Sequence, residues 1–446
     1  MQSRRDHVQA YQFVTSRLAS ALTTGDPGRG EPPLRRSSLG LMWGVLVAVL
    51  LCLGFAVYGL IVPGGNTDYK KAGAIVVEKE TGNRYLYLDG VLYPTLNTAS
   101  AMLFYAGSNQ TGQFTPVSRN SLAGVPHGPA VGIPGAPDSV PQAKDLVGPE
   151  WSLCAAPGAT APSLVIDIDP NTPTKGLDDD SRYLVQGPDL VNYAVWRDRI
   201  FPIGSHTALV ALGFGDVPPT KVPIVWIHQL EQGPTLDVPK IPDAGQNFQD
   251  GLKVGDLVRA DAGGTPQTFV VRKDGVAPVN PTALALLLGQ PGAAQPKQIS
   301  TAELATLPES ADHTLLQGTP NLVSARNFIA DQAMCVLQHS RGDVVGKGEL
   351  VIEPLPVVAG RILMNVPPGR GMLAVAEPAP SQANNRTYYL ITDQGEKFRV
   401  AQQAFGPLGL GNAPVGVPKE VLDAMPSGPD LVMGKAVLTA NRGGGQ

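Results

Sequence analysis

The residues that could perform catalysis or bind metal ions are few and scattered along this 446-residue chain. Its six histidines lie at positions 7, 127, 206, 228, 313 and 339, and none has a second ligand at metal-binding spacing. The chain contains neither an H-E-x-x-H nor a G-x-S-x-G motif. His228 and Trp226 lie in an apolar segment, which is more typical of packing side chains than of catalytic groups. We therefore predict no catalytic, cofactor-binding or metal-binding residue.

The segment from Gly342 to Gly348 (G-D-V-V-G-K-G) partly resembles a phosphate-binding loop. A Walker A motif needs four residues between its glycines and a hydroxyl residue after its lysine. This segment has three residues between Gly342 and Gly346, and Lys347 is followed by Gly348. A turn between strands explains it better.

A second segment begins like a calcium-binding loop, with Asp167, Asp169 and Asn171 at alternate positions. The sixth position of such a loop should be glycine and is Thr172, and the twelfth should be glutamate and is Asp178. We expect a solvated acidic turn here, with adventitious cation binding as the alternative.

One apolar segment is long enough to cross a membrane. Leu39 to Val62 carries no charge, with Arg35 and Arg36 before it and Pro63 after it. As a helix of about 1.5 Å per residue it would reach roughly 36 Å, enough to cross a hydrocarbon core of about 30 Å. A cleaved signal peptide has a shorter apolar core. We therefore predict a signal anchor, with a single transmembrane helix at 39–62.

Basic residues indicate the orientation, because Lys and Arg beside a span tend to stay in the cytoplasm. Arginines precede the span at positions 4, 5, 17, 29, 35 and 36, whereas the nearby lysines after it, at 70, 71 and 79, are offset by acidic neighbours. We predict a single-pass protein of the cytoplasmic (inner) membrane, with a cytoplasmic N-terminus and an extracytoplasmic, or periplasmic, region 63–446.

The cysteines fit an exported region. Cys52 lies in the span, which leaves Cys154 and Cys335 as an even pair in an oxidising compartment. We predict a disulfide between them, the alternative being two buried thiols. In the chain-entropy model, closing so long a loop stabilises the fold by roughly 5 kcal/mol at most.

The composition favours short elements and many turns. Gly and Pro number 51 and 42, and charged residues make up only 16% of the chain. Hydrophobic residues still reach 43%, which is not a disordered composition. A net charge of −4 without a basic cluster gives nucleic-acid binding no electrostatic support.

The N-terminal tail is predicted to form one amphipathic helix. Ser3 and Asp6 have the spacing of a capping box, and apolar residues recur at helical intervals at 8, 11, 14, 18 and 22. The helix should run from about Arg4 to Thr23, followed by a linker to residue 38. Because so short a tail cannot bury this stripe, we expect the helix either to dock on a partner's cytoplasmic domain or to lie on the membrane surface.

Beyond the span the sequence repeats a unit of strand, turn, strand and small-residue helix. The strand–turn–strand parts lie at 85–94, 193–202, 269–278 and 388–398. Each surrounds an Asp-Gly turn or its equivalent, a strong hairpin signal. Repeats of this kind predict small α+β modules that pack against their neighbours.

We predict an α+β fold in which four such repeats form an elongated periplasmic domain around a central β-rich domain that contains both cysteines. The predicted limits are 1–38 for the cytoplasmic helix and linker, about 73–141, 183–245, 252–317 and 384–432 for repeats 1 to 4, about 142–182 plus 318–383 for the central domain, and 433–446 for a flexible tail.

Several stretches resemble one known family. The opening SRRDHVQAYQFVTSRLASAL, the PPLRR before the span, GAIVVEKETGNRYLYLDGVLYP at 73–94 and VPPGRGMLAV at 366–375 are similar to the EccB family, a membrane component of actinobacterial type VII (ESX) secretion systems. The resemblance implies repeats similar to phage cell-wall-binding subunits and a homo-oligomer. It also implies assembly with EccC (the motor ATPase), EccD and EccE, with the MycP protease as a peripheral partner.

These observations predict a structural subunit of a type VII secretion pore, whose periplasmic repeats mediate assembly or contact the cell wall. Two alternatives stay open. Some family members carry an ATPase label, so the exported domain could hydrolyse nucleotide, although this chain offers no nucleotide motif. The protein could instead be a stand-alone anchor that binds peptidoglycan.

Overall fold

The computed structural model describes residues 4–25, 34–61, 67–107, 112–262, 264–358, 360–382 and 385–434. The chain divides into two units, Met1–Thr67 with Val117–Ala123, and Asp68–Pro116 with Gly124–Gln446, and each is described by itself. Ser3 of the predicted capping box, most of the predicted linker and most of the predicted tail 433–446 lie outside the described residues.

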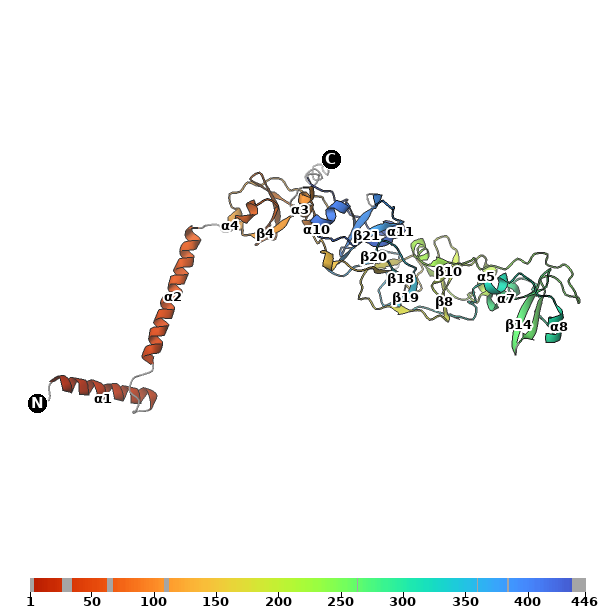
Figure 1. Cartoon of the computed structure of the whole chain (residues 1–446), viewed down its shortest axis with the longest axis horizontal. Helices are drawn as coiled ribbons and strands as arrows, with labels where there is room; N and C mark the ends of the chain where they lie inside the picture. The colour runs from red at the N-terminus through yellow and green to blue at the C-terminus, as the bar shows by residue number, and fades with distance from the viewer. Residues whose placement is uncertain are drawn as a thin grey trace. The chain divides into compact units, whose positions relative to one another are not determined.

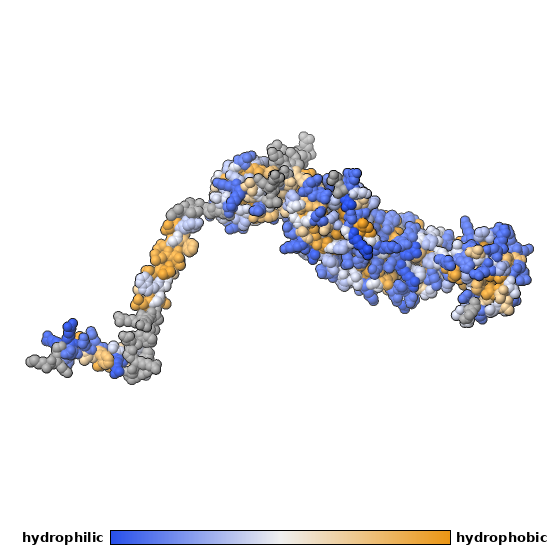
Figure 2. All heavy atoms as spheres, viewed as in Figure 1, coloured by the Kyte–Doolittle hydropathy of each residue, from blue (hydrophilic) through white to orange (hydrophobic). Residues whose placement is uncertain are grey.

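The first unit contains the long helices α1 (Arg4–Thr24) and α2 (Leu34–Ile61) and the short helix α4 (Arg119–Leu122) (Figure 1). The apolar side chains of α1 are exposed, Tyr11 by 72% and Leu22 by 82%. Within α2, Leu39–Gly59 is long and apolar enough to cross a membrane, and Figure 2 shows it as largely hydrophobic. Both helices therefore present apolar side chains that none of the described residues covers.

Four sheets in the second unit share one strand order. In each, the first strand pairs with the second, the second with the third, and a fourth strand returns beside the first. The fourth strand runs parallel to the first in repeats 2, 3 and 4. The α+β fold is thereby confirmed, because each hairpin is followed by a short helix before the chain returns to the sheet.

The sheets of repeats 1 and 2 are formed by β1 (Ala74–Glu78), β2 (Arg84–Leu88), β3 (Val91–Pro94) and β4 (Gln113–Val117), and by β8 (Ser181–Gln186), β9 (Asn192–Trp196), β10 (Arg199–Pro202), β11 (Thr220–Lys221) and β12 (Glu231–Gln232), with β17 (Arg326–Asn327) beside β8. Their helices are α3 (Thr98–Phe104), α5 (His206–Ala211) and α6 (Ile224–Ile227).

The sheets of repeats 3 and 4 are formed by β13 (Leu257–Ala262), β14 (Thr265–Val271), β15 (Val276–Pro278) and β16 (Lys297–Gln298), and by β21 (Gly371–Glu377), β22 (Tyr388–Thr392), β23 (Lys397–Val400) and β24 (Val415–Pro418). Their helices are α7 (Pro281–Leu288), α8 (Thr301–Thr306), α9 (Thr314–Gln317), α10 (Phe405–Leu408) and α11 (Lys419–Ala424).

The fourth repeat begins earlier than the sequence suggested. Its first strand, β21, pairs with β22 from Gly371 to Val375, yet the sequence prediction assigned 318–383 to the central domain. The predicted limit of 384 is therefore too late for this sheet. The reason is that the hairpin turn is visible in the sequence, whereas a buried apolar strand such as β21 does not reveal which sheet it joins.

Turn chemistry and helix caps explain why the unit recurs. Tight hairpin turns need a positive φ, which Asp89 and Gly90 adopt at 50° and 84°. Three of the helices that follow are capped by a side chain that accepts a hydrogen bond from the first turn, those of Asn97, Ser205 and Asn280. These caps satisfy backbone N–H groups that would otherwise have no partner, so helices of only six to eight residues are stable at these places.

In three repeats an aromatic ring of the third strand rests on a glycine. The pairs are Tyr93 with Gly128, Phe201 with Gly233, and Phe398 with Gly428, and a Cβ atom on these glycines would lie 2.4, 2.2 and 2.1 Å from a ring carbon. The bridges between Val276 and Glu309 and between Lys397 and Ser427 place Ala277 and Ser310 at the corresponding positions of repeat 3. There a small side chain replaces the ring, and a hydroxymethyl group fits where the others need glycine.

The central sheet has the strand order β20 (Ile362–Asn365), β6 (Leu164–Asp167), β5 (Glu150–Ala155), β18 (Ala333–His339), β19 (Glu349–Glu353) and β7 (Lys175–Gly176). One of its faces packs into the largest apolar cluster, which also includes Trp226 of repeat 2 and Val421 of repeat 4. The Trp226 indole is buried and donates a hydrogen bond to the backbone oxygen of Met334 at 3.3 Å. Its predicted role as a packing residue agrees with this position.

Candidate functional site

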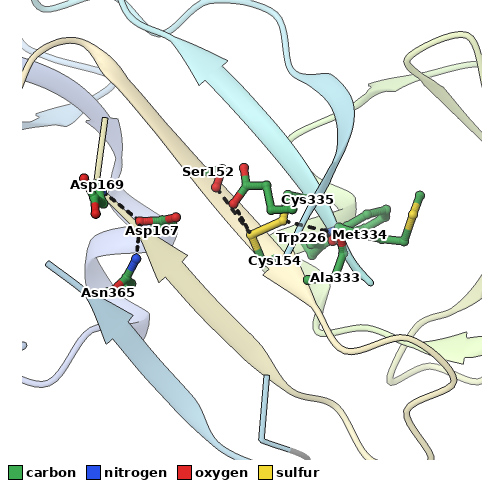
Figure 3. The surroundings of a disulfide bond; sticks show 10 residues. Ser152, Cys154, Asp167, Asp169, Trp226, Ala333, Met334, Cys335 and Asn365 are labelled. Carbon is green, nitrogen blue, oxygen red and sulfur yellow. Dashed lines mark hydrogen bonds between the residues drawn. A yellow bond between two sulfur atoms is a disulfide. The ribbon is translucent and has the colours of Figure 1, made fainter. Parts of the chain in front are cut away.

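Both cysteines and two acidic residues lie on one face of the central sheet, opposite the apolar cluster. Cys154 of β5 is paired in register with Cys335 of β18. On the other side of β5, Ser152 is paired with Asp167 of β6. Because strand side chains alternate between the two faces, Ser152 and Cys154 point to the same side, and so does Asp167. We call the cysteine-bearing side of this sheet the disulfide face (Figure 3).

The Cys154 and Cys335 sulfur atoms are 2.09 Å apart, at disulfide bonding distance, across a sequence separation of 181 residues. Both cysteines are fully buried, and Val165, Ala333 and Val351 surround them. The bond therefore joins β5 and β18, two adjacent strands of the central sheet. In the sequence, β5 precedes repeats 2 and 3, and β18 follows them.

Glu353 extends over the disulfide from the end of β19. Its side chain is buried, and its Oε2 lies 3.2 Å from Cys154 Sγ. Burial raises the pKa of the Glu353 carboxyl to about 7. The negative charge of Asp167 and hydrogen bonding with Asp167 add to this rise, while hydrogen bonding with Ser152 opposes it. At neutral pH this carboxyl is therefore divided between its protonated and ionised forms.

Asp167 is the second buried carboxyl of the disulfide face. Its Oδ1 accepts hydrogen bonds from the Asp169 backbone N–H at 2.8 Å and from Asn365 Nδ2 at 2.9 Å. Its Oδ2 is buried and has no hydrogen-bond partner in the described parts of the chain. Burial is the main cause that raises the pKa of Asp167. The predicted solvated acidic turn is therefore wrong at this residue, because strand alternation places Asp167 on the same face as the buried Val165.

The rest of the predicted calcium-like segment does not converge on Asp167. Asp178, the twelfth residue, is 62% exposed and lies 3.7 Å from Arg326. Asp169 accepts a hydrogen bond from the Asn171 backbone N–H within its own turn. A calcium loop of twelve consecutive residues is thus not formed.

The lysine of the phosphate-loop-like segment lies at the surface. Lys347 Nζ is 3.0 Å from Glu231 Oε2, and its side chain is 86% exposed. The segment turns back on itself through hydrogen bonds between the backbones of Arg341 and Val344. The prediction of a turn agrees with this geometry.

The histidines form no common site in the described residues. His228 Nδ1 lies 2.8 Å from Glu420 Oε2, which links repeat 2 to repeat 4. His313 lies beside Glu309, and His339 beside Glu150 and Glu349. The grouping that best suits a metal by distance combines both cysteine sulfurs with Glu353, within 4.8 Å of one another, but the sulfurs are bonded to each other.

Sequence reasoning missed Glu353 and Ser152. The only signal was a pattern, E-L-V-I-E at 349–353, in which an acidic residue ends an apolar strand at an inward position. Such an end residue can equally begin an exposed loop. Only the pairing of β19 with β18 shows that Glu353 turns toward the cysteines.

Comparison with known proteins places the chain among secretion components. Residues 1–442 match the family model described as "Type VII secretion system ESX-1, transport TM domain B". The chain is 28% identical to the protein named ESX-3 secretion system ATPase EccB3 of Mycolicibacterium smegmatis, over 97% of this chain and 90% of that protein. It is 26% identical to ESX-5 secretion system ATPase EccB5 of Mycobacterium marinum, over 98% and 93% of the two chains.

Solved structures share the fold. A chain of an intact ESX-5 inner membrane complex is similar with a TM-score of 0.62 and 22% identity, over 98% of this chain and 95% of that chain. A chain of an EccB3 dimer from the ESX-3 core complex is similar with a TM-score of 0.60 and 23% identity, over 82% and 99% of the two chains.

Proposed function

We propose that this chain, which belongs to the EccB family of type VII secretion membrane proteins, is a non-catalytic structural subunit of a secretion complex in the inner membrane. The observation that carries the proposal is the match over residues 1–442, which includes both exposed apolar helices as well as the repeats. The chain is a single-pass protein of the inner membrane, with α2 as its span and its repeats in the periplasm.

The partners follow from the family. We propose that the chain assembles with EccC, EccD and EccE subunits, with MycP at the periphery, and with further copies of itself. A relative has been solved as an EccB3 dimer, which supports self-association here. The exposed apolar stripe of α1 supports a cytoplasmic contact with one of these subunits, because an apolar helix face in water is stabilised by a partner's groove.

A paired substitution on α1 tests this contact. Leu18→Asp places a charge on the apolar stripe, whereas Ser16→Asp places the same charge about 200° around the helix. Both side chains are exposed, so neither change should unfold the chain. We expect Leu18→Asp, like deletion of residues 1–24, to release the other subunits on native gels, and Ser16→Asp to leave the complex intact. An intact complex with Leu18→Asp would disprove docking through this stripe.

Nucleotide hydrolysis is the second candidate, because several relatives carry ATPase in their names. Lys347 is the one residue that the sequence suggests for phosphate contact, and it is held at the surface by Glu231. We expect any phosphate release by the purified protein to be unchanged in Lys347→Ala. Lys273→Ala removes another exposed lysine that is paired with an aspartate and serves as the control. A selective loss of turnover in Lys347→Ala would favour the enzyme.

A further inference from the structure

A cavity of about 100 Å³ opens beside the disulfide, and oxygen-bearing side chains line much of it. These include Glu150, Ser152, Asp167, Asp169, Thr172 and Glu353, which we call the acidic pocket. The lining contains no lysine, arginine or histidine in the described parts of the chain. Four carboxyl groups thus line one small space, and of these the exposed Glu150 lies beside His339, outside the lining.

The burial of the two central carboxyls makes this arrangement unusual. Asp167 is 3% exposed and Glu353 is 1% exposed, so water solvates neither well. Buried carboxylates in proteins are normally paired with a cation or bound to a metal ion, because the cost of removing their charge from water is large. Among the described residues, N–H donors reach Oδ1 of Asp167, whereas its buried Oδ2 receives no hydrogen bond from a donor.

The free oxygen faces the pocket. In Figure 3 the dashed hydrogen bonds of Asp167 leave from one side of its carboxyl group, and the other side faces the strand that carries Ser152 and Cys154. Asp167 and Glu353 lie close enough to interact, because both the negative charge of Asp167 and hydrogen bonding between the two carboxyls contribute to the raised pKa of Glu353. Two neighbouring buried carboxyls are stabilised either by a proton that they share or by a cation that both of them bind.

We propose that the acidic pocket binds one hard divalent cation, Ca²⁺ or Mg²⁺, through the carboxylates of Asp167 and Glu353, with Ser152, Thr172 and water completing the oxygen shell. Such ions prefer carboxylate, hydroxyl and water oxygens, at about 2.3–2.6 Å for Ca²⁺ and 2.0–2.1 Å for Mg²⁺. A cavity of about 100 Å³ accommodates an ion with one or two waters. The ion would hold β6 against β19 across the disulfide.

The proposal is tested on the full-length protein in detergent, with the disulfide intact, after removal of metal ions by a chelator. The thermal unfolding midpoint is measured at pH 7.5 with and without 10 mM CaCl₂ or MgCl₂ (about ten times the weak affinity typical of extracellular calcium modules), at matched ionic strength. We expect one of the two cations to raise the midpoint by about 3 °C, because only the folded protein has the site.

Variants assign the effect to the pocket. Asp167→Asn keeps the shape of the side chain and removes its charge, so we expect the cation-dependent shift to disappear. Asp180→Asn removes a carboxyl from the nearby exposed acidic stretch and should keep the full shift. A shift that survives in Asp167→Asn would overturn the proposal, as would a wild-type midpoint that depends on pH but on neither cation, which would assign the two carboxyls to a shared proton.

A direct measurement covers the case in which Asp167→Asn does not fold. Equilibrium dialysis of the wild-type protein with radioactive calcium, and competition by magnesium, gives the number of ions bound per chain. About one calcium ion per wild-type chain that magnesium displaces, together with an affinity at least tenfold lower in Glu353→Gln, supports the site. Binding that stays far below one ion per chain, or that is equal in Glu353→Gln and wild type, excludes it.

Discussion

In repeat 2 the ring of Phe201 lies on Gly233 with no space for a further carbon atom, whereas the disulfide face of the central sheet leaves a cavity beside two buried carboxyls. The first arrangement is a close fit between apolar groups and occurs in three of the four repeats. The second occurs once and depends on charge and on a covalent bond. The repeats should therefore respond to changes of side-chain volume, and the central sheet to changes of oxidation and protonation.

Repeat 3 shows that the close fit is a matched pair. Where the ring is replaced by Ala277, the glycine is replaced by Ser310, whose hydroxyl donates a hydrogen bond to Asp274 at 2.7 Å. The pair has thus changed at both positions within one chain. Either change alone would leave a cavity or a clash, because interiors are packed to nearly the density of crystals.

The largest effect is expected from overfilling the close fit in repeat 2. Gly233→Val should destabilise the protein by about 3 kcal/mol or more, because the added carbons would meet the Phe201 ring at 2.2 Å. Chemical denaturation followed by circular dichroism measures the loss. Gly245 has a positive φ that would strain a valine, so Gly245→Val does not serve as the control. The control is Ser310→Ala in repeat 3, which should lose about 1 kcal/mol because the hydrogen bond of Ser310 is removed.

A double substitution sharpens this comparison. Gly233→Ser with Phe201→Ala converts repeat 2 to the pair found in repeat 3. The double variant should be more stable than the sum of the two single losses predicts, by about 1 kcal/mol, because the serine occupies space that the ring has left. Strictly additive losses would show that the two positions are not matched through contact.

A somewhat smaller effect is expected from removing the disulfide. Cys154→Ala with Cys335→Ala should lower the free energy of unfolding by about 3 kcal/mol, since the closed loop spans 181 residues. Cys52→Ala, in α2, provides the control and should leave the unfolding midpoint unchanged. Equal midpoints for the wild type and the variant that lacks both periplasmic cysteines would contradict a stabilising bond.

An effect smaller than that of the disulfide concerns protonation. The pKa of Glu353 is about 7 in the folded chain against 4.5 for an unperturbed glutamate, so between these values the folded state binds more protons than the unfolded state. In buffer without divalent cations, stability should therefore be greatest toward pH 5 and fall by about 2 kcal/mol as the pH rises to 8. Thermal midpoints measure the fall.

Two glutamine variants assign this pH dependence. Glu353→Gln should flatten the curve, because the glutamine carries no titrating proton. Glu309→Gln, at a side chain that is 77% exposed, should leave the curve as in wild type. A slope that persists in Glu353→Gln would assign the effect to another group, with Asp167 as the nearest one.

Much of the fold could be predicted from residues close together in the chain. The Asp89-Gly90 turn and the caps at Asn97 and Asn280 act within a few residues, so their effect is visible in the sequence. The limit of the fourth repeat was predicted too late because β21 joins its sheet through backbone hydrogen bonds, which leave no residue-specific mark. Glu353 was missed for a similar reason, since its burial depends on strands that are far apart in sequence.

The amino-acid sequence by itself determined the apolar span, the repeated hairpins, the likeness to the EccB family and the candidate cysteine pair, because each depends on residue type and local spacing. Only the tertiary structure decided that Asp167 is buried, that one of its oxygens has no hydrogen-bond donor among the described residues and that Glu353 faces it across the disulfide. The physical reason is that the charge state and ligands of a carboxyl depend on what surrounds it in space, and strands separated by nearly two hundred residues form these surroundings.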